Sequence, residues 1–109
     1  MAAIQNLLID QGTTFALDLT VSGADGSAKN LADYTVAGQL RKSYYSTTYT
    51  AFTANITDAA LGQVEITLTA TQTSALKAGR YVYDVEITSA SETLRIIEGI
   101  ITVTPEVTK

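Results

Sequence analysis

The residue types that could perform chemistry are few in this sequence. The 109 residues include no His and no Cys, so acid–base or nucleophilic catalysis would have to rest on carboxylates, lysines or tyrosines. Asp84 and Glu86, two residues apart on one face of an expected strand, form a pair that could act as acid and base or hold a cation. A solvated strand face that discourages edge pairing is the simpler interpretation, because exposed carboxylates are common. We therefore predict no catalytic residue and no enzymatic activity.

No cofactor or metal motif accompanies these carboxylates. The sequence lacks a phosphate-cradling glycine loop and a dinucleotide fingerprint. Its Asp residues lack the spacing of a calcium loop, and the absence of Cys excludes thiolate metal ligands. We predict neither a cofactor nor a metal site.

A local group of cations and aromatic side chains is formed by Arg41, Lys42, Tyr44, Tyr45 and Tyr49. Aromatic rings beside cations can stack single-stranded bases. However, a net charge of -4 and a pI of about 4.5 give little attraction for phosphates, whereas Tyr and Arg are enriched at protein–protein hot spots. We therefore predict a protein contact through Arg41, Tyr44, Tyr45 and Tyr49, and no nucleic-acid partner.

Residues 78–87 are expected to form the central strand. Apolar and polar side chains alternate along this segment, the pattern of a strand with one buried and one wet face: Tyr81, Tyr83, Val85 and Ile87 against Arg80, Asp84 and Glu86. A tyrosine that follows a tight glycine turn is typical of the tyrosine corner of Greek-key sandwiches, in which the hydroxyl group bonds nearby backbone.

The remaining pattern predicts an all-β protein. Six further extended segments are expected at 3–9, 13–21, 34–42, 52–56, 63–70 and 93–104, with a helical turn capped by Thr71 over 71–76. We therefore predict a single immunoglobulin-like β-sandwich of about seven antiparallel strands over residues 1–109. Residues 1–12 are a candidate N-terminal arm, and 105–109 a C-terminal tail. No signal peptide or membrane-spanning run is visible, and no membrane contact is predicted.

The last expected strand carries apolar residues on both faces, as the pairs Ile96–Ile97 and Ile100–Ile101 show. A bulge at Gly99 would restore one continuous buried face. Otherwise the second face would be covered by another subunit. Ile97 and Ile101 are therefore candidates for protein contact.

The N-terminal segment raises the same question, because Leu7, Leu8 and Ile9 are consecutive apolar residues. An extended arm of this kind can pair with the exposed strand edge of a neighbour. Leu7 and Leu8 are therefore further candidates for protein contact.

Four stretches, in this order along the chain, carry a resemblance to a known group of proteins: DQGTTF at 10–15, QLRKSY at 39–44, AGRYVYDVE at 78–86 and EGIITVTPEVT at 98–108. They resemble short virion structural proteins of tailed bacteriophages. These are similar to the amino-terminal immunoglobulin-like domain of phage baseplate upper proteins, which attach receptor-binding machinery to the tail. The resemblance covers nearly the whole chain and rests on turns, a strand core and a terminal stop.

The resemblance implies a non-enzymatic virion protein, present in many symmetric copies and assembled in the host cytoplasm. Its partners would be capsid, baseplate or tail subunits. Baseplate upper proteins continue into a long fibrous region, whereas this sequence stops at Lys109. A capsid decoration protein, or a baseplate or tail adaptor, is therefore expected as much as a fibre anchor. The alternative is a carbohydrate- or receptor-binding module that uses the tyrosines. This alternative predicts a concave face where aromatic rings meet Asp or Asn.

Overall fold

Two β-sheets, here called sheet A and sheet B, hold nearly all the regular structure in a computed structural model that describes residues 3–23 and 26–107. Sheet A contains six strands: β1 (Ala3–Ile4), β2 (Leu7–Asp10), β4 (Thr35–Arg41), β5 (Thr50–Ala51), β8 (Gly79–Thr88) and β9 (Thr93–Thr104). Sheet B contains three strands: β3 (Phe15–Thr20), β6 (Thr53–Asp58) and β7 (Gln63–Leu68). The prediction of an all-β protein is confirmed.

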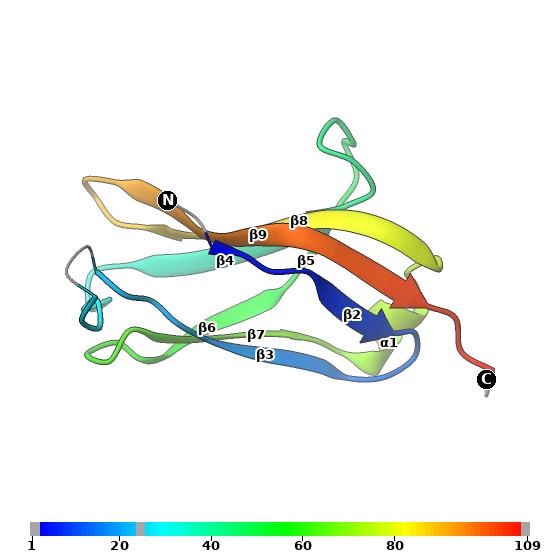
Figure 1. Cartoon of the computed structure of the whole chain (residues 1–109), viewed down its shortest axis with the longest axis horizontal. Coiled ribbons are helices and arrows are strands. Elements are labelled where there is room, and N and C mark those ends of the chain that lie inside the picture. The colour runs from blue at the N-terminus through cyan, green and yellow to red at the C-terminus, as the bar shows by residue number, and fades with distance from the viewer. Residues whose placement is uncertain (1–2, 24–25, 108–109) are drawn as a thin grey trace.

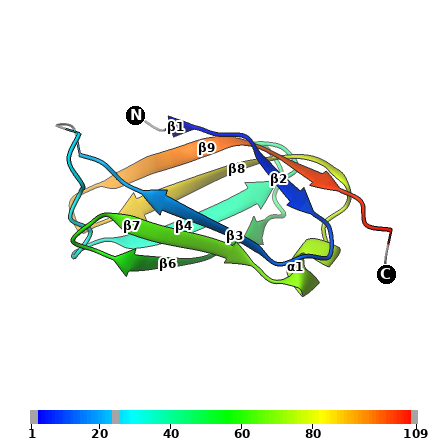
Figure 2. The same cartoon turned by 60° about the horizontal axis from the view of Figure 1, so that its bottom comes forward.

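The two sheets lie one above the other (Figure 1), with the order β1-β9-β8-β4-β5 in sheet A and β3-β7-β6 in sheet B. β2 pairs with the same edge of β9 as β1, farther along the strand (Figure 2). The chain passes from sheet A to sheet B at Phe52, the single residue between β5 and β6, which is 6% exposed. No helix within 3–23 and 26–107 is long and apolar enough to cross a membrane.

The period-2 patterns place the core between the sheets. On β7, and on β8 from Tyr83 to Ile87, every second side chain is buried, as the alternation predicts. The larger core cluster contains Ile9, Leu40, Phe52, Ile66, Leu68, Leu76, Tyr83, Val85, Ile97, Ile101 and Val103. A smaller cluster, Val21, Leu31, Val64 and Ile87, fills the other end.

The described part of the candidate N-terminal arm does not leave the domain. β1 and β2 pair in parallel with β9 of the same chain, with Ala3 opposite Ile97 and Leu7 opposite Ile101. The prediction of antiparallel strands throughout is therefore wrong at this edge, because residues 3–10 satisfy their backbone groups on β9. Residues 1–2 of the expected arm and 108–109 of the expected tail lie outside the described residues.

The bulge in β9 lies at Ile96 and not at Gly99. Val85 pairs with Ile97 and Glu86 with Arg95, which leaves Ile96 as the extra residue. Gly99 is required for a different reason, since a Cβ there would lie 2.2 Å from the backbone oxygen of Gln5. The glycine therefore admits the N-terminal strand to the edge of β9.

The helical turn after β7 begins earlier than predicted. Helix α1 (Ala70–Ser74) is capped by Thr69, whose side chain accepts a bond from the Gln72 N–H, while the Gln72 side chain accepts one from the Thr69 N–H. This reciprocal capping box satisfies two free donors and fixes the start at Ala70. The expected cap at Thr71 is therefore wrong by two residues.

The turn after α1 contains the tyrosine bond that the sequence predicts. Tyr81 donates its hydroxyl hydrogen to the backbone oxygen of Lys77 at 2.8 Å. Gly79 between them has a φ of 137°, a conformation that favours glycine. The bond ties the start of β8 to the end of the preceding turn.

Candidate functional site

The most exposed aromatic side chains lie on residues 42–49, here called the tyrosine loop, which connects β4 to β5 and rises above sheet A (Figure 1). Tyr44 is 74% exposed, Tyr45 95% and Tyr49 53%. The loop is held at its base because the Arg41 guanidinium donates to the backbone oxygen of Ser46. Ser46 in turn accepts from the Ser43 N–H through its side chain at 3.1 Å. The sequence correctly predicts that these tyrosines lack a buried face.

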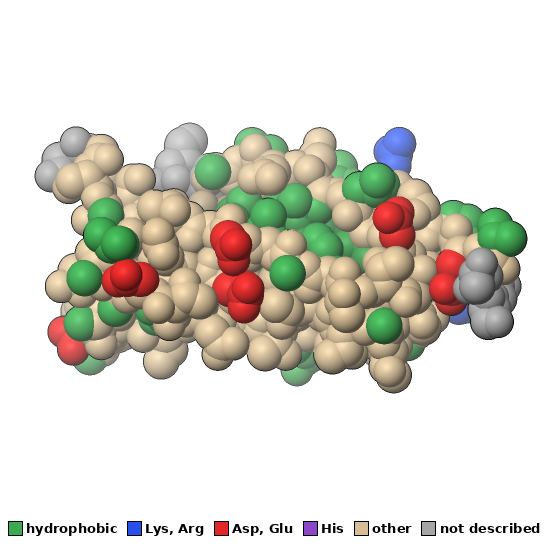
Figure 3. Space-filling view, turned by 90° about the horizontal axis from the view of Figure 1, so that it is seen from below, with side chains coloured by type: hydrophobic (Ala, Val, Ile, Leu, Met, Phe, Trp, Pro, Cys, Tyr) green, Lys and Arg blue, Asp and Glu red, His purple; other side chains and the backbone are tan. Residues whose placement is uncertain are grey.

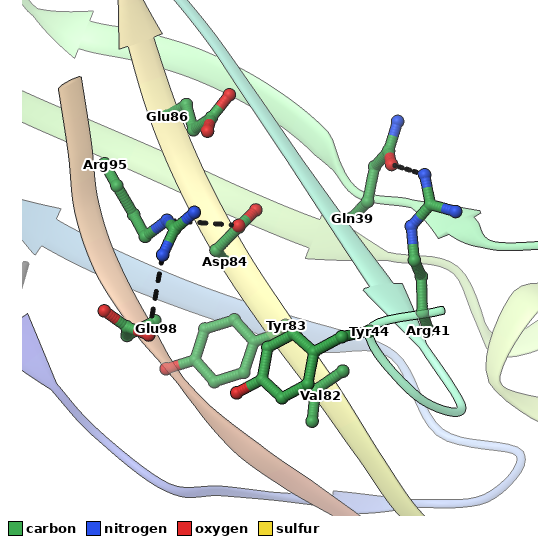
Figure 4. A pocket seen from close by; sticks show the side chains of 9 residues that line it. All are labelled: Gln39, Arg41, Tyr44, Val82, Tyr83, Asp84, Glu86, Arg95 and Glu98. Atoms are coloured by element: carbon green, nitrogen blue, oxygen red, sulfur yellow. Dashed lines mark hydrogen bonds and ion pairs between the residues drawn. The ribbon is translucent and has the colours of Figure 1, made fainter. Parts of the chain in front are cut away.

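A pocket of about 360 Å³ lies beside this loop on the outer surface of sheet A and is here called the sheet-face pocket (Figure 4). Polar and charged side chains from three strands line it together with one tyrosine of the loop: Gln39, Arg41, Tyr44, Asp84, Glu86, Arg95 and Glu98. The strand period explains this gathering, since these positions on β4, β8 and β9 all point away from the core.

Two ion pairs neutralise part of the sheet-face pocket. Arg95 Nε lies 3.3 Å from Asp84 Oδ2, and Arg95 Nη1 lies 3.7 Å from Glu98 Oε1. Asp84 is therefore engaged by a cation and does not form an isolated pair with Glu86. Within the described ranges, no group of three or more carboxylates is arranged to hold a metal ion.

A second pocket, of about 480 Å³, lies at the base of the tyrosine loop and is here called the loop-base pocket. The Arg41 guanidinium carbon sits 4.9 Å from the ring centroid of Tyr49. Lys42 Nζ sits 4.8 Å from that of Tyr81. Lys77, from the turn before β8, completes the cationic lining.

Sequence reasoning missed Lys77 and Tyr81 as members of this site. Both lie more than thirty residues along the chain from Lys42, and they reach it because β4 and β8 are neighbours in sheet A. The sequence signal that could have found them is the tyrosine-corner pattern, which places the turn before β8 next to Tyr81, the first tyrosine of that strand. That pattern predicts the turn but not the loop packed against it.

The candidate contact residues divide into exposed and buried groups. Leu8 is 62% exposed, while Leu7 is half-buried and packs against the core. Ile97 and Ile101 are 4% and 0% exposed, so the prediction that they contact a partner is wrong. They point inward because they lie an even number of residues from Val103 on β9, with all three residues on the same side of the bulge at Ile96.

A third tyrosine environment lies where the N-terminal segment meets β9, here called the β9 seam (Gln5, Asn6, Tyr83, Gly99 and Ile100). Tyr83 donates its hydroxyl hydrogen to the backbone oxygen of Gln5 at 2.6 Å. The Asn6 side chain accepts from the Ile100 N–H at 3.1 Å. Burial raises the pKa of Tyr83 to about 12.

The outer surface of sheet B differs from that of sheet A. Figure 3 shows this side as mostly uncharged, with acidic side chains standing out singly or in pairs. Asp18 on β3 lies directly opposite Glu65 on β7, a like-charge pair across the two strands. The exposed tyrosines and both pockets described above are associated with sheet A.

Comparisons with known proteins bear on the fold alone. No protein-family model and no curated protein sequence matches the chain. Among solved structures, the chain is similar to InlP from Listeria monocytogenes, with a TM-score of 0.51 and 16% identity over 94% of this chain and 28% of that one. A family 123 glycoside hydrolase from Clostridium perfringens gives a TM-score of 0.42 and 12% identity over 97% of this chain and 24% of that one. The chain thus spans about a quarter of the length of these structures, and the second likeness is too weak to support an argument.

Proposed function

We propose that the two sheets form one immunoglobulin-like sandwich of seven strands. β1 and β2 share one register on β9 and count as a single interrupted strand. β5 and β6 count as another, because only Phe52 separates them. The bond from Tyr81 to Lys77 has the tyrosine-corner pattern of such sandwiches. The likeness to InlP supports the fold and no more.

We propose that this domain is a non-enzymatic docking module. The observation that carries the proposal is the exposure of Tyr44 and Tyr45, at 74% and 95%, on a loop that stands above its sheet. Large aromatic side chains left in water gain free energy when a partner covers them, and they add little conformational entropy cost because they have few rotatable bonds. Leu8 on β2 and Ile100 on β9, 62% and 39% exposed, add apolar surface elsewhere on the same sheet.

The partners that we propose are capsid, baseplate or tail subunits of a tailed bacteriophage. This part of the proposal rests on the four sequence stretches that resemble virion structural proteins. A module repeated over many sites of a particle gains avidity, so a contact of modest area at each site is sufficient. The proposed location is the virion, with assembly in the host cytoplasm.

The test is a phage that carries Tyr44→Ala together with Tyr45→Ala. We expect the domain to fold normally and to be lost from purified particles. Leu61→Ala is the matched control, because Leu61 is also a large exposed apolar residue, 52% exposed, between β6 and β7 and outside the loop. Incorporation of the double variant at the wild-type level would overturn docking through this loop.

A second candidate function is carbohydrate or receptor binding. It is favoured by the sheet-face pocket, where Tyr44 lies in the same concavity as Gln39 and Asp84. An aromatic platform beside polar side chains is suited to a sugar ring. In that case the double tyrosine variant assembles normally into particles that no longer attach to the host. Normal assembly and normal attachment together would exclude both uses of the loop.

A further inference from the structure

The cations of the described chain divide into paired and unpaired groups. Lys29 pairs with Glu92, and Arg95 pairs with Asp84 and Glu98. The other four have no ion pair with any described residue: Arg41, Lys42, Lys77 and Arg80. All four lie where β4 meets the tyrosine loop, in the turn before β8 or at the start of β8, and these segments are adjacent in the fold. Among the described residues, the uncompensated positive charge of this acidic protein therefore lies at one end.

Three of these four cations line the loop-base pocket, and no carboxylate is among its lining residues. The rest of the lining is largely apolar or uncharged. Ala75 and Ala78 contribute methyl groups, and the buried Leu40 and Leu76 connect the pocket to the core. The pocket thus combines positive charge with an apolar wall. An apolar group that carries an anion therefore fits it better than an apolar group alone or an anion alone.

Two of the cations remain available for bonds to a ligand. Arg41 already donates to Ser46 and to the Gln39 side chain. Lys42 and Lys77 make no side-chain hydrogen bond or ion pair with the described residues. Lys42 is held above the Tyr81 ring, a position that orients its ammonium group without using its three donors.

We propose that the loop-base pocket binds an acidic peptide segment of a partner protein, with carboxylates on Lys42 and Lys77 and an apolar side chain against Ala75 and Ala78. The inference rests on the docking function proposed above and specifies the chemistry of the partner. A nucleic acid fits less well, because its affinity requires many phosphate contacts and the net charge of the chain is -4. A neutral sugar fits less well, because Arg41 and Lys42 already occupy a face of Tyr49 and Tyr81.

The test uses nuclear magnetic resonance of the whole 15N-labelled chain. The probe is a blocked five-residue peptide with a central leucine flanked on each side by two aspartates, and the control peptide has asparagines in their place. We expect saturable shifts for the acidic peptide at residues 42, 48–50 and 75–81, and at least tenfold weaker binding of the asparagine peptide. Raising the salt from about 50 to about 200 mM should weaken the acidic complex.

The decisive experiment compares two double variants, each of which removes two positive charges, inside the pocket in one variant and outside it in the other. Lys42→Gln with Lys77→Gln should weaken the acidic peptide at least tenfold. Lys29→Gln with Arg80→Gln has the same net charge but leaves the pocket lining intact, and should change affinity less than twofold. Equal losses in the two double variants, or shifts elsewhere on the domain, would overturn the proposal. So would tighter binding of the sulfated polysaccharide heparin at the same residues.

Two further results separate this inference from the docking function itself. The Tyr44→Ala, Tyr45→Ala variant should keep the peptide affinity, because neither side chain lines the loop-base pocket. Loss of that variant from particles together with absent peptide binding would leave docking intact and overturn only the pocket. Concentration-dependent shifts at the pocket without peptide would identify a second copy as its occupant and would likewise overturn the partner assignment.

Discussion

Tyrosine is a buried structural residue along the β9 seam, whereas in the tyrosine loop it stands in solvent. Tyr83 is 4% exposed, and its hydroxyl group is bonded to the Gln5 backbone oxygen. Tyr45 is 95% exposed and has no hydrogen bond or ring contact with the described residues. The first arrangement holds two distant segments together, while the second leaves aromatic surface available to another molecule.

The surroundings explain the difference. At the seam, Gly99 lies opposite Tyr83 on the neighbouring strand and leaves room for the N-terminal backbone. In the loop, the base is fixed by Arg41 and Ser46, and the tip has no sheet beside it. A substitution at the seam should therefore act on the free energy of unfolding, and one at the loop tip on binding.

The largest loss is expected for Gly99→Ala. The added Cβ would lie 2.2 Å from the Gln5 oxygen, so the N-terminal strand must move off β9. We expect a loss of about 3 kcal/mol in the free energy of unfolding, measured by urea denaturation. Gly26→Ala is the control, because open space surrounds it and only its φ of 85° opposes the change, at a cost of about 1 kcal/mol. Equal losses would contradict steric exclusion at the seam.

Tyr83→Phe should cost about 1 to 2 kcal/mol at neutral pH, because the Gln5 oxygen loses its donor in a partly buried hydrogen bond. The pH dependence gives a second readout. The pKa of Tyr83 is raised from 10.0 to about 12 in the folded protein. The unfolded chain therefore releases this proton first, and the contribution to stability is lost as the pH rises from 10 to 12.

The comparison of wild type with Tyr83→Phe isolates that contribution from the other titrating groups. The difference in unfolding free energy between the two proteins should shrink above pH 10. Tyr45→Phe serves as the control and should follow the wild-type curve. A constant difference up to pH 12 would show that the Tyr83 hydroxyl group is not buried in solution.

An intermediate effect is expected for Tyr81→Phe. Its hydroxyl group bonds the Lys77 oxygen, as Tyr83 bonds Gln5, but the bond is exposed to solvent. Water can replace the lost donor, so we expect a loss of about 0.5 to 1 kcal/mol in urea denaturation. A cost above that of Tyr83→Phe would show that the turn before β8, and not the β9 seam, limits stability.

The parts of the fold that follow from the sequence are those with local periodicity. The alternation of 63–70 and 78–87 predicts the two strands that the structure has at 63–68 and 79–88, and the lack of a burial period predicts the tyrosine loop. The helix start was predicted two residues late because two threonines precede Gln72 and the capping box uses the first.

The remaining features depend on contacts between residues distant in sequence. Gly99 has the sequence signature of a bulge, yet its role is set by Gln5, ninety-four residues earlier. Likewise, Lys77 and Tyr81 join Arg41 and Lys42 only through the pairing of β4 with β8. One sequence cannot specify such pairings, since many registers satisfy the same alternation.

The smallest effect on folding is expected for Tyr44→Ala with Tyr45→Ala. Because both side chains are largely in water, their removal should change the free energy of unfolding by less than about 0.5 kcal/mol. The measurement is urea denaturation of the purified domain, with Tyr83→Phe in parallel as the variant that must show a loss. A loss above about 1 kcal/mol would mean that the loop packs against sheet A in solution. The contrast between seam and loop would then fail, and loss of the variant from particles would no longer distinguish docking from folding.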